Sequence, residues 1–153
     1  MGVSILPYRL VGLGLWLLFF LIISRKDWKA LYPALVFTAL LGTVADIYGV
    51  MYKQWEYIGP TTGGISLWSD LGIAPPQGGF AIYLHRRFPR WSWLNWLFWI
   101  SANAVGEWLF VHWGLIRYHQ WSSLKATLFY FPFFALIYLQ ERWWKGDEGG
   151  AFY

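Results

Sequence analysis

The sequence predicts an all-α integral membrane protein, a bundle of five transmembrane helices whose third span is broken by proline and glycine. The chain is 58% hydrophobic and 13% charged, whereas roughly 25% of the residues in ordinary soluble proteins are charged. Its apolar runs have about the 20 residues that a helix needs to cross ~30 Å of hydrocarbon. Short clusters of Lys and Arg separate these runs, as in the loops that orient membrane spans. We therefore expect one transmembrane domain, residues 1–153.

The first two spans are expected at about residues 6–24 and 30–52. Basic residues follow the first span at Arg25, Lys26 and Lys29. A cleaved signal peptide would carry its charge in front and a small-residue cleavage site behind, so we expect a retained helix. In the second span, Pro33 falls in the first turn, where its missing N–H costs little.

Small and polar residues share one face of the second span, because they recur at spacings of three and four residues. Such a seam lets another helix approach closely. The residues on this seam are Thr38, Gly42, Asp46 and Gly49.

The third span, at about residues 65–84, follows a polar connection rich in turn formers that covers residues 53–64. It contains Asp70 and a run of helix breakers, namely Gly72, Pro75, Pro76, Gly78 and Gly79. A continuous α-helix through two adjacent prolines would lose backbone hydrogen bonds and kink. At membrane depth, irregular backbone is tolerated only where protein or a water-filled cavity covers it.

The fourth and fifth spans are expected at about residues 91–113 and 122–139. Trp91 and Trp113 mark the ends of the fourth span, at the level where amphipathic rings favour the headgroups. Glu107 lies inside this span, where an ionised group is costly and must face protein or water. Ala102 and Gly106 form a small-xxx-small pair, which predicts close packing against another helix.

The distribution of Lys and Arg predicts the orientation. Cytoplasmic loops are enriched in these residues, and eight of the twelve fall on one side of the predicted topology. We therefore expect a multi-pass protein of the bacterial cytoplasmic membrane, with its N-terminus outside and its C-terminus inside. The eight are Arg25, Lys26, Lys29, Arg86, Arg87, Arg90, Arg142 and Lys145.

This topology places four ionisable residues at a similar depth near the outer surface. An unpaired charge there costs ~2.5–3.5 kcal/mol on insertion scales, and mutual placement would offset that cost. We therefore predict an outward-facing polar pocket, which Asn103 joins from one turn below Glu107. The predicted pocket residues are Asp46, Asp70, Asn103, Glu107 and Lys125.

The pocket has three interpretations: a structural one, an ion or small-molecule site, or a catalytic site. In the structural one, Glu107 pairs with Lys125 and Asp46 bonds Ser66 or a carbonyl near Pro75. We expect no metal and no cofactor, because His112 and His119 fit no recognised ligand spacing and the chain has no cysteine. Basic residues do not gather on one face, which argues against nucleic acid.

The segment from Glu107 to Phe134 resembles the carboxyl-terminal half of an uncharacterised family of small multi-spanning proteins from spore-forming Gram-positive bacteria. Such proteins share an acidic residue, an Ile-basic-Tyr turn, a Trp and a Thr-containing last helix. The resemblance implies a cytoplasmic-membrane location and no assigned activity. The matching residues are Glu107, Ile116, Arg117, Tyr118, Trp121 and Thr127. The run WEYIG and the Asp-bearing third span are similar, in layout alone, to carotenoid lycopene cyclases, although the acidic proline motif of that family is not reproduced.

Three functions remain open on the sequence. Small size and the lack of a catalytic motif favour a non-enzymatic subunit or partner of a larger membrane assembly, or a homo-oligomer, embedded in the lipid bilayer. The grouped carboxyls would also suit an ion- or proton-coupled carrier with a moving third span. The third possibility is an enzyme that acts on a lipid or isoprenoid, with a buried carboxylic acid as proton donor.

Overall fold

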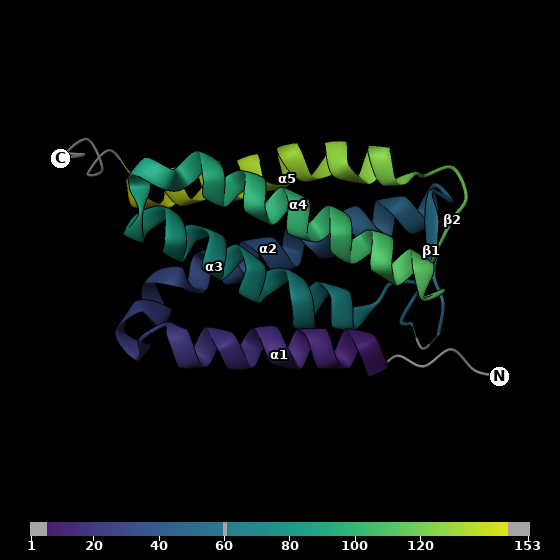
Figure 1. The fold of residues 1–153 in the computed structure, drawn as a ribbon, viewed down its shortest axis with the longest axis horizontal. Helices are drawn as coiled ribbons and strands as arrows, with labels where there is room; N and C mark the ends of the chain where they lie inside the picture. The colour runs from purple at the N-terminus through teal and green to yellow at the C-terminus, as the bar shows by residue number, and fades with distance from the viewer. Residues whose placement is uncertain (1–5, 60, 147–153) are drawn as a thin grey trace.

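The computed structural model describes residues 6–59 and 61–146, and this part of the chain is all-α, as predicted (Figure 1). Five α-helices make up most of it: α1 (Leu6–Ile22), α2 (Arg25–Met51), α3 (Ala74–Arg87), α4 (Ser92–His112) and α5 (Ser123–Lys145). A π-helix, η1 (Trp68–Ile73), leads directly into α3, and a 3-10 turn, η2 (Pro89–Trp91), leads into α4. Two short strands, β1 (Trp55–Tyr57) and β2 (Ile116–Tyr118), pair with each other.

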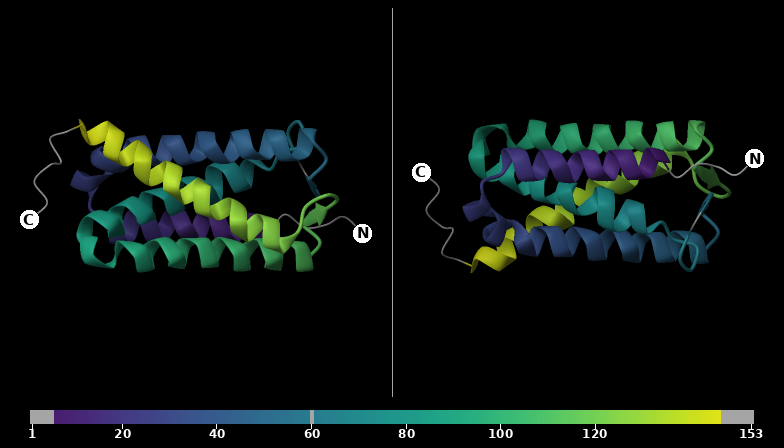
Figure 2. Two further views of the ribbon diagram at one scale, coloured as in Figure 1. Left: turned by 90° about the horizontal axis from the view of Figure 1, so that it is seen from above. Right: turned by 90° about the horizontal axis from the view of Figure 1, so that it is seen from below.

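The helices lie along the long axis of the molecule and alternate in direction (Figures 1 and 2). Helix α1 begins at the end of the bundle that carries the strands, which we call the strand end, and α5 finishes at the opposite end. Asp46, Asp70 and Glu107 lie in the half of their elements nearer the strand end, since α2 and α4 run toward that end and η1 starts from it.

Helix α2 begins at Arg25, five residues before the predicted start, so the predicted position of Pro33 in a first turn is wrong. Polar contacts fix this earlier start. Ser24 Oγ donates a hydrogen bond to Asp27 Oδ2 (2.6 Å), and Trp28 Nε1 donates to the Ile23 carbonyl (2.9 Å). Pro33 therefore lies inside the helix, as Pro132 does in α5.

The predicted break in the third span is a change of helix type. Residues 68–73 form a π-helix, in which the Ala74 N–H bonds to the Ser69 carbonyl five residues back. Pro75 and Pro76 then occupy the first turn of α3, where their missing N–H groups are least costly. Pro75 has no N–H to donate to the Leu71 carbonyl. That carbonyl instead accepts a hydrogen bond from Trp16 Nε1 of α1 (3.1 Å). Protein therefore covers the irregular backbone.

Part of the small-residue seam on α2, Thr38 and Gly42, faces another helix, whereas Gly49 faces the Trp55 ring of β1. Thr38 is buried against Gly78 of α3, where an added Cβ atom would overlap with the Thr38 side chain. Gly42 faces Ala74 of the same helix, with 3.4 Å between an ideal Cβ at Gly42 and the Ala74 Cβ. The glycines in the breaker run thus serve close helix packing.

No strand is expected from the sequence within residues 53–64. Strand β1 pairs antiparallel with β2, and Trp55, Glu56 and Tyr57 lie opposite Tyr118, Arg117 and Ile116. Both segments alternate apolar and charged side chains, W-E-Y and I-R-Y, which is a strand pattern. The pair ties the α2–η1 connection to the α4–α5 connection across the strand end.

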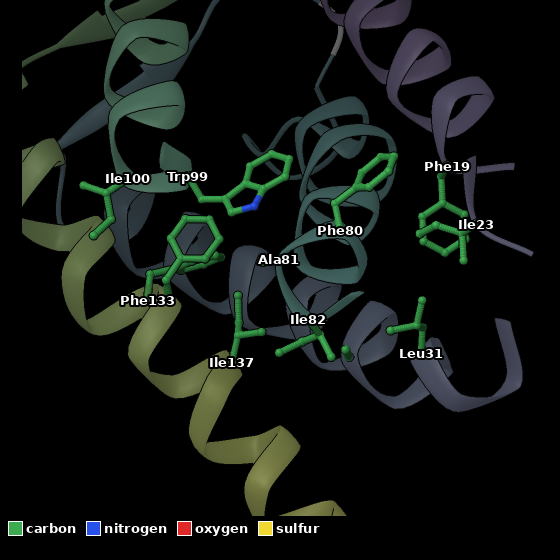
Figure 3. Close-up of a cluster of buried hydrophobic side chains, with 12 residues drawn as sticks. Phe19, Ile23, Leu31, Phe80, Ala81, Ile82, Trp99, Ile100, Phe133 and Ile137 are labelled. Carbon is green, nitrogen blue, oxygen red and sulfur yellow. The ribbon is translucent and has the colours of Figure 1, made fainter. Parts of the chain in front are cut away.

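The main apolar core fills the half of the bundle away from the strands (Figure 3). Phe80 and Trp99 stack with ring centroids 6.2 Å apart, and Trp99 and Phe134 stack at 6.5 Å. A smaller cluster of Tyr8, Ile73, Leu115 and Ile116 lies under the strands. Four of the polar residues predicted to form the pocket line a cavity that members of both clusters, such as Phe80 and Ile73, also line.

Candidate functional site: an acidic, aromatic-lined cavity

A cavity of about 490 Å³ lies inside the bundle and receives side chains from all five α-helices, η1 and both strands. Four of the five predicted pocket residues line it: Asp46, Asp70, Asn103 and Glu107. Lys125 is not among the described residues that line the cavity. The structure therefore brings together acids that lie up to 61 residues apart in the sequence, which is the separation of Asp46 from Glu107 (107 − 46).

Asp46 of α2 and Asp70 of η1 form an adjacent pair of carboxyl groups. Asp46 is 7% exposed and Asp70 is 2% exposed. Asp46 interacts with Asp70 and with the Tyr57 hydroxyl, and Asp70 also interacts with Thr43. One oxygen of each aspartate, Oδ2, has no hydrogen-bond partner among the described residues. Two adjacent carboxylates repel, and a shared proton or a bound cation would relieve that repulsion.

Glu107 of α4 has a different environment. Tyr118 donates a hydrogen bond to its Oε1 (2.5 Å), and Tyr130 donates to its Oε2 (2.6 Å). Both oxygens are therefore engaged, and the two tyrosines hold α4 to β2 and to α5. Burial, followed by the neighbouring Glu107 carboxylate, raises the pKa of Tyr118, so its hydroxyl keeps the proton that it donates.

The predicted pairing of Glu107 with Lys125 is wrong. Lys125 lies in the first turn of α5, and its Nζ donates a hydrogen bond to the Gln120 carbonyl (2.6 Å) at the strand end. Its backbone N–H bonds to Ser122 Oγ (3.3 Å), which caps the helix. The Lys125 side chain is exposed in the first turn of α5. Ser66 is one of two partners expected for Asp46, but Asp46 bonds Tyr57 and Asp70 instead, and Ser66 Oγ accepts from the Ser69 N–H (3.3 Å).

Asn103 and Gly106 give the α4 wall of the cavity its shape. Asn103 Nδ2 donates to the Trp99 carbonyl one turn earlier (2.8 Å), which folds the side chain against its own helix. A Cβ atom at Gly106 would meet no described atom within 4 Å. The predicted close helix contact at Ala102 and Gly106 is therefore wrong, and both residues line the cavity instead.

Sequence reasoning missed the aromatic lining and the tyrosines that bind Glu107. Tyr118 belongs to the Ile-basic-Tyr turn that carried the family resemblance, so a signal for it existed. Tyr130 lies 23 residues after Glu107 and on another helix, so no sequence pattern indicates the hydrogen bond between them. The aromatic residues that line the cavity are Trp55, Tyr57, Phe80, Phe98, Trp99, Phe110, Trp121, Phe129, Tyr130 and Phe133.

The wall of the cavity reaches the outer surface of the bundle at α1 and α4. Helix α1 packs mainly on η1 and α3, whereas α4 packs mainly on α5 and α3. Two residues that line the cavity from α1 and α4, Leu18 and Phe98, are also 48% and 58% exposed on the outer surface. At the strand end, by contrast, Trp55, Tyr57 and Ile116 of the strand pair lie over the cavity.

The histidines near the strand end lie outside the cavity. His119 Nε2 is 3.4 Å from Glu56 Oε2, and Arg117 Nη1 donates to Glu56 Oε1 (2.6 Å) on the exposed surface of the strand pair. His112 stacks on Trp108 with ring centroids 5.6 Å apart. Within residues 6–59 and 61–146, no group of three or more His, Cys, Asp or Glu residues could hold a metal ion.

A second polar cluster lies at the opposite end of the bundle. Arg86 donates from Nε and Nη2 to the two oxygens of Glu141 (2.6 and 2.8 Å) and from Nη2 to the Ala30 carbonyl (3.1 Å). Lys145 Nζ is 3.2 Å from Glu141 Oε1. This cluster joins α2, α3 and α5, and its charges are paired, so we assign it a structural role.

Comparison with family models, with curated proteins and with solved structures gives no match for this chain. The resemblance to a family of spore-forming bacteria therefore stays a prediction. By length and apolar composition, one helix among the described residues, α2, could cross a membrane, and α1 is a shorter apolar helix.

Proposed function

We propose that this chain is an integral membrane protein that crosses the bacterial cytoplasmic membrane five times. The outer surface of α1 supports the proposal, because Leu10, Leu13, Leu17 and Leu21 are 58 to 72% exposed along one face. Meanwhile Asp46 and Asp70 are buried. Apolar residues outside and carboxyl groups inside suit a protein whose surroundings are lipid.

The positions of tryptophans agree with this proposal. The rise from Trp91 to Trp113 is ~33 Å at ~1.5 Å per residue, close to the ~30 Å of a hydrocarbon core. Trp91 and Trp93 are exposed at one end of α4, and Trp113 is exposed at the other. Such rings anchor a helix at both interfaces.

Within this membrane setting, we propose that the protein is a proton-coupled carrier of cations that uses the acidic cavity. The observation that carries the proposal is the Asp46–Asp70 pair, in which each carboxyl group has a buried oxygen with no hydrogen-bond partner among the described residues. A pair that binds either a proton or a cation can exchange one for the other. Asp70 also lies in a π-helix, and π-bulges frequently occur at functional sites.

Proteoliposomes test the carrier function. Vesicles that contain a pH-sensitive dye receive Na⁺, K⁺ or tetraphenylphosphonium outside, and exchange of a cation for internal protons would raise the internal pH. We expect at least one of these cations to do so at a rate above that of protein-free vesicles. The double variant Asp46→Asn/Asp70→Asn should lose this response.

Glu56→Gln is the matched control, because Glu56 is an acidic residue on the exposed strand pair. It should exchange cations as the wild type does. The carrier function is wrong if no cation raises the internal pH, or if the double variant exchanges as fast as the wild type.

A second candidate is a subunit of a larger membrane assembly. Its support is the pair Trp143 and Trp144 at the end of α5, which are 77% and 60% exposed with no aromatic neighbour beyond each other among the described residues. Purification in mild detergent tests it. A partner chain or a homo-oligomer should co-purify, and a stable monomer alone would count against it.

A further inference from the structure

We propose that the cavity binds a hydrophobic organic cation, with Asp46 and Asp70 facing its charge and the aromatic lining facing its apolar groups. This inference rests on the proposed membrane location and deepens the carrier function by naming a class of cargo. It depends on three features of the cavity: its uncompensated acids, its aromatic lining and the wall that reaches the outer surface at α1 and α4.

Among residues 6–59 and 61–146, no cationic side chain pairs with the acids of the cavity. Among the described residues, those that line the cavity include no Lys, Arg or His. The nearby basic residues are engaged elsewhere: Arg9 lies over the Trp68 ring (5.6 Å), Arg117 binds Glu56, and Lys125 binds the Gln120 carbonyl. A cation from outside the chain would therefore supply the missing charge.

The spacing of the acids favours a bulky cation over a compact metal ion. Asp46 and Asp70 are adjacent, whereas Glu107 has both oxygens occupied by tyrosine hydroxyls and is not free to serve as a third ligand. Small metal ions need several ligands that converge closely, and the described residues offer no such group. A delocalised organic charge requires only one or two nearby carboxylates.

The walls of the cavity match the apolar part of such a ligand. Trp, Tyr and Phe rings attract cations through their faces, in addition to the apolar area that they bury. The cavity volume of about 490 Å³ falls within the range of roughly 300–1,000 Å³ that is typical of drug-sized ligands.

A hydrophobic ligand would enter between α1 and α4, where the cavity wall reaches the outer surface. Leu18 and Phe98 are exposed on the face that we assign to lipid, and both line the cavity. An amphipathic cation that partitions into the membrane would reach the acids from the side, without passing the aromatic residues of the strand pair.

Binding of tetraphenylphosphonium to the purified full-length chain in detergent tests the inference, with protein-free micelles as the blank. Tetraphenylborate has the same shape and the opposite charge, so it controls for apolar partitioning. We expect the chain to bind the cation and not the anion. Asp70→Asn should weaken binding by at least about 30-fold, as for removal of one member of a buried charge pair.

Gly106→Phe tests the cavity without a change of charge. The new ring would fill open space, because a Cβ atom at Gly106 meets no described atom within 4 Å. We expect it to abolish tetraphenylphosphonium binding while leaving the melting temperature close to that of the wild type. Val105→Phe is the matched control, since the neighbouring Val105 is 57% exposed on the outer face of α4 and should bind normally.

Equal binding of the phosphonium and borate ions would overturn the inference, as would unchanged binding by the Asp70→Asn and Gly106→Phe variants. The two proposals fail separately. Binding of the phosphonium ion without cation–proton exchange in vesicles would support this inference and reject the carrier function. Exchange of Na⁺ or K⁺ for protons without phosphonium binding would support the carrier function and reject this inference.

Discussion

Three carboxyl groups face one cavity, yet their surroundings give them different roles. Glu107 is held by two tyrosine hydroxyls, so it positions α4 against β2 and α5. Asp46 and Asp70 each have an oxygen with no hydrogen-bond partner among the described residues. A buried polar group without a hydrogen bond costs about 1–3 kcal/mol. The aspartates are therefore the residues that gain most from a ligand or a proton.

Glu141, at the other end of the bundle, shows a carboxylate with a purely structural role. It lies beyond residue 139, where the predicted fifth span ends. Burial alone would raise the pKa of Glu141, but the hydrogen bonds and charge of Arg86, with Lys145, outweigh it and lower the pKa below 4.5. The ion pair therefore stabilises the fold fully above pH 4.5, and this stabilisation is lost as pH falls through the lower folded pKa.

We predict that Glu141→Gln lowers the free energy of unfolding at pH 7 by about 1–3 kcal/mol, because it leaves Arg86 without its carboxylate partner. The difference from the wild type should shrink as pH falls below 4.5. Thermal unfolding in detergent, followed by tryptophan fluorescence, measures both effects. Glu56→Gln removes an exposed ion pair and should change stability by only ~0–1 kcal/mol. If Glu141→Gln destabilised the protein as much below pH 4.5 as at pH 7, the prediction would be contradicted.

At the scale of helices, the contact between α2 and α3 includes one complementary pair, Thr38 and Gly78. Thr38 fills the space that Gly78 leaves open. We predict that Gly78→Ala costs about 1–3 kcal/mol of stability through overpacking. Adding Thr38→Gly should restore part of the lost stability, because the methyl group introduced at position 78 then occupies the space that the Thr38 side chain left.

Chemical or thermal unfolding of the two single variants and the double variant gives the interaction energy between the sites. A double variant no more stable than expected from the sum of the single variants would contradict this account of the helix contact.

Apolar run length and interfacial tryptophans were enough to predict most helix ends within three residues, but α5 runs to Lys145, six residues beyond its predicted end at 139. Helix α2 starts earlier than predicted because Ser24, Asp27 and Trp28 form contacts there that hydrophobicity does not indicate. The π-helix depends on a hydrogen bond from Trp16 of another helix, and the strands have three residues each. Local sequence patterns do not encode such long-range contacts.

For the whole molecule, the alternation of helix directions accounts for what could be predicted of the site. It places Asp46, Asp70, Asn103 and Glu107 at one level, and all four line the cavity. Lys125 shares that level but lies in a first turn, where the adjacent loop offers it a carbonyl. The topology thus predicts how far each residue lies from the end of the bundle. The direction of its side chain and its hydrogen-bond partner can be read only from the three-dimensional structure.

The absence of cysteine from the sequence permits a direct test of the proposed orientation. We predict that single cysteines at Thr61 and Arg90, both exposed and at opposite ends of the bundle, label differently in intact cells. A membrane-impermeant maleimide should label Thr61→Cys and spare Arg90→Cys until the cells are lysed. The reverse pattern would invert the topology, and labelling of both in intact cells would reject a membrane-spanning bundle.

The π-helix also sets the direction in which Asp70 points. Each residue of an α-helix turns the chain by about 100° around the helix axis, at 3.6 residues per turn. Deleting Gly72 would let residues 68–73 close with ordinary α-helical bonds, and Asp70 would swing by about that angle relative to α3. The aspartate would then leave Asp46, so a single inserted residue suffices to create the carboxyl pair.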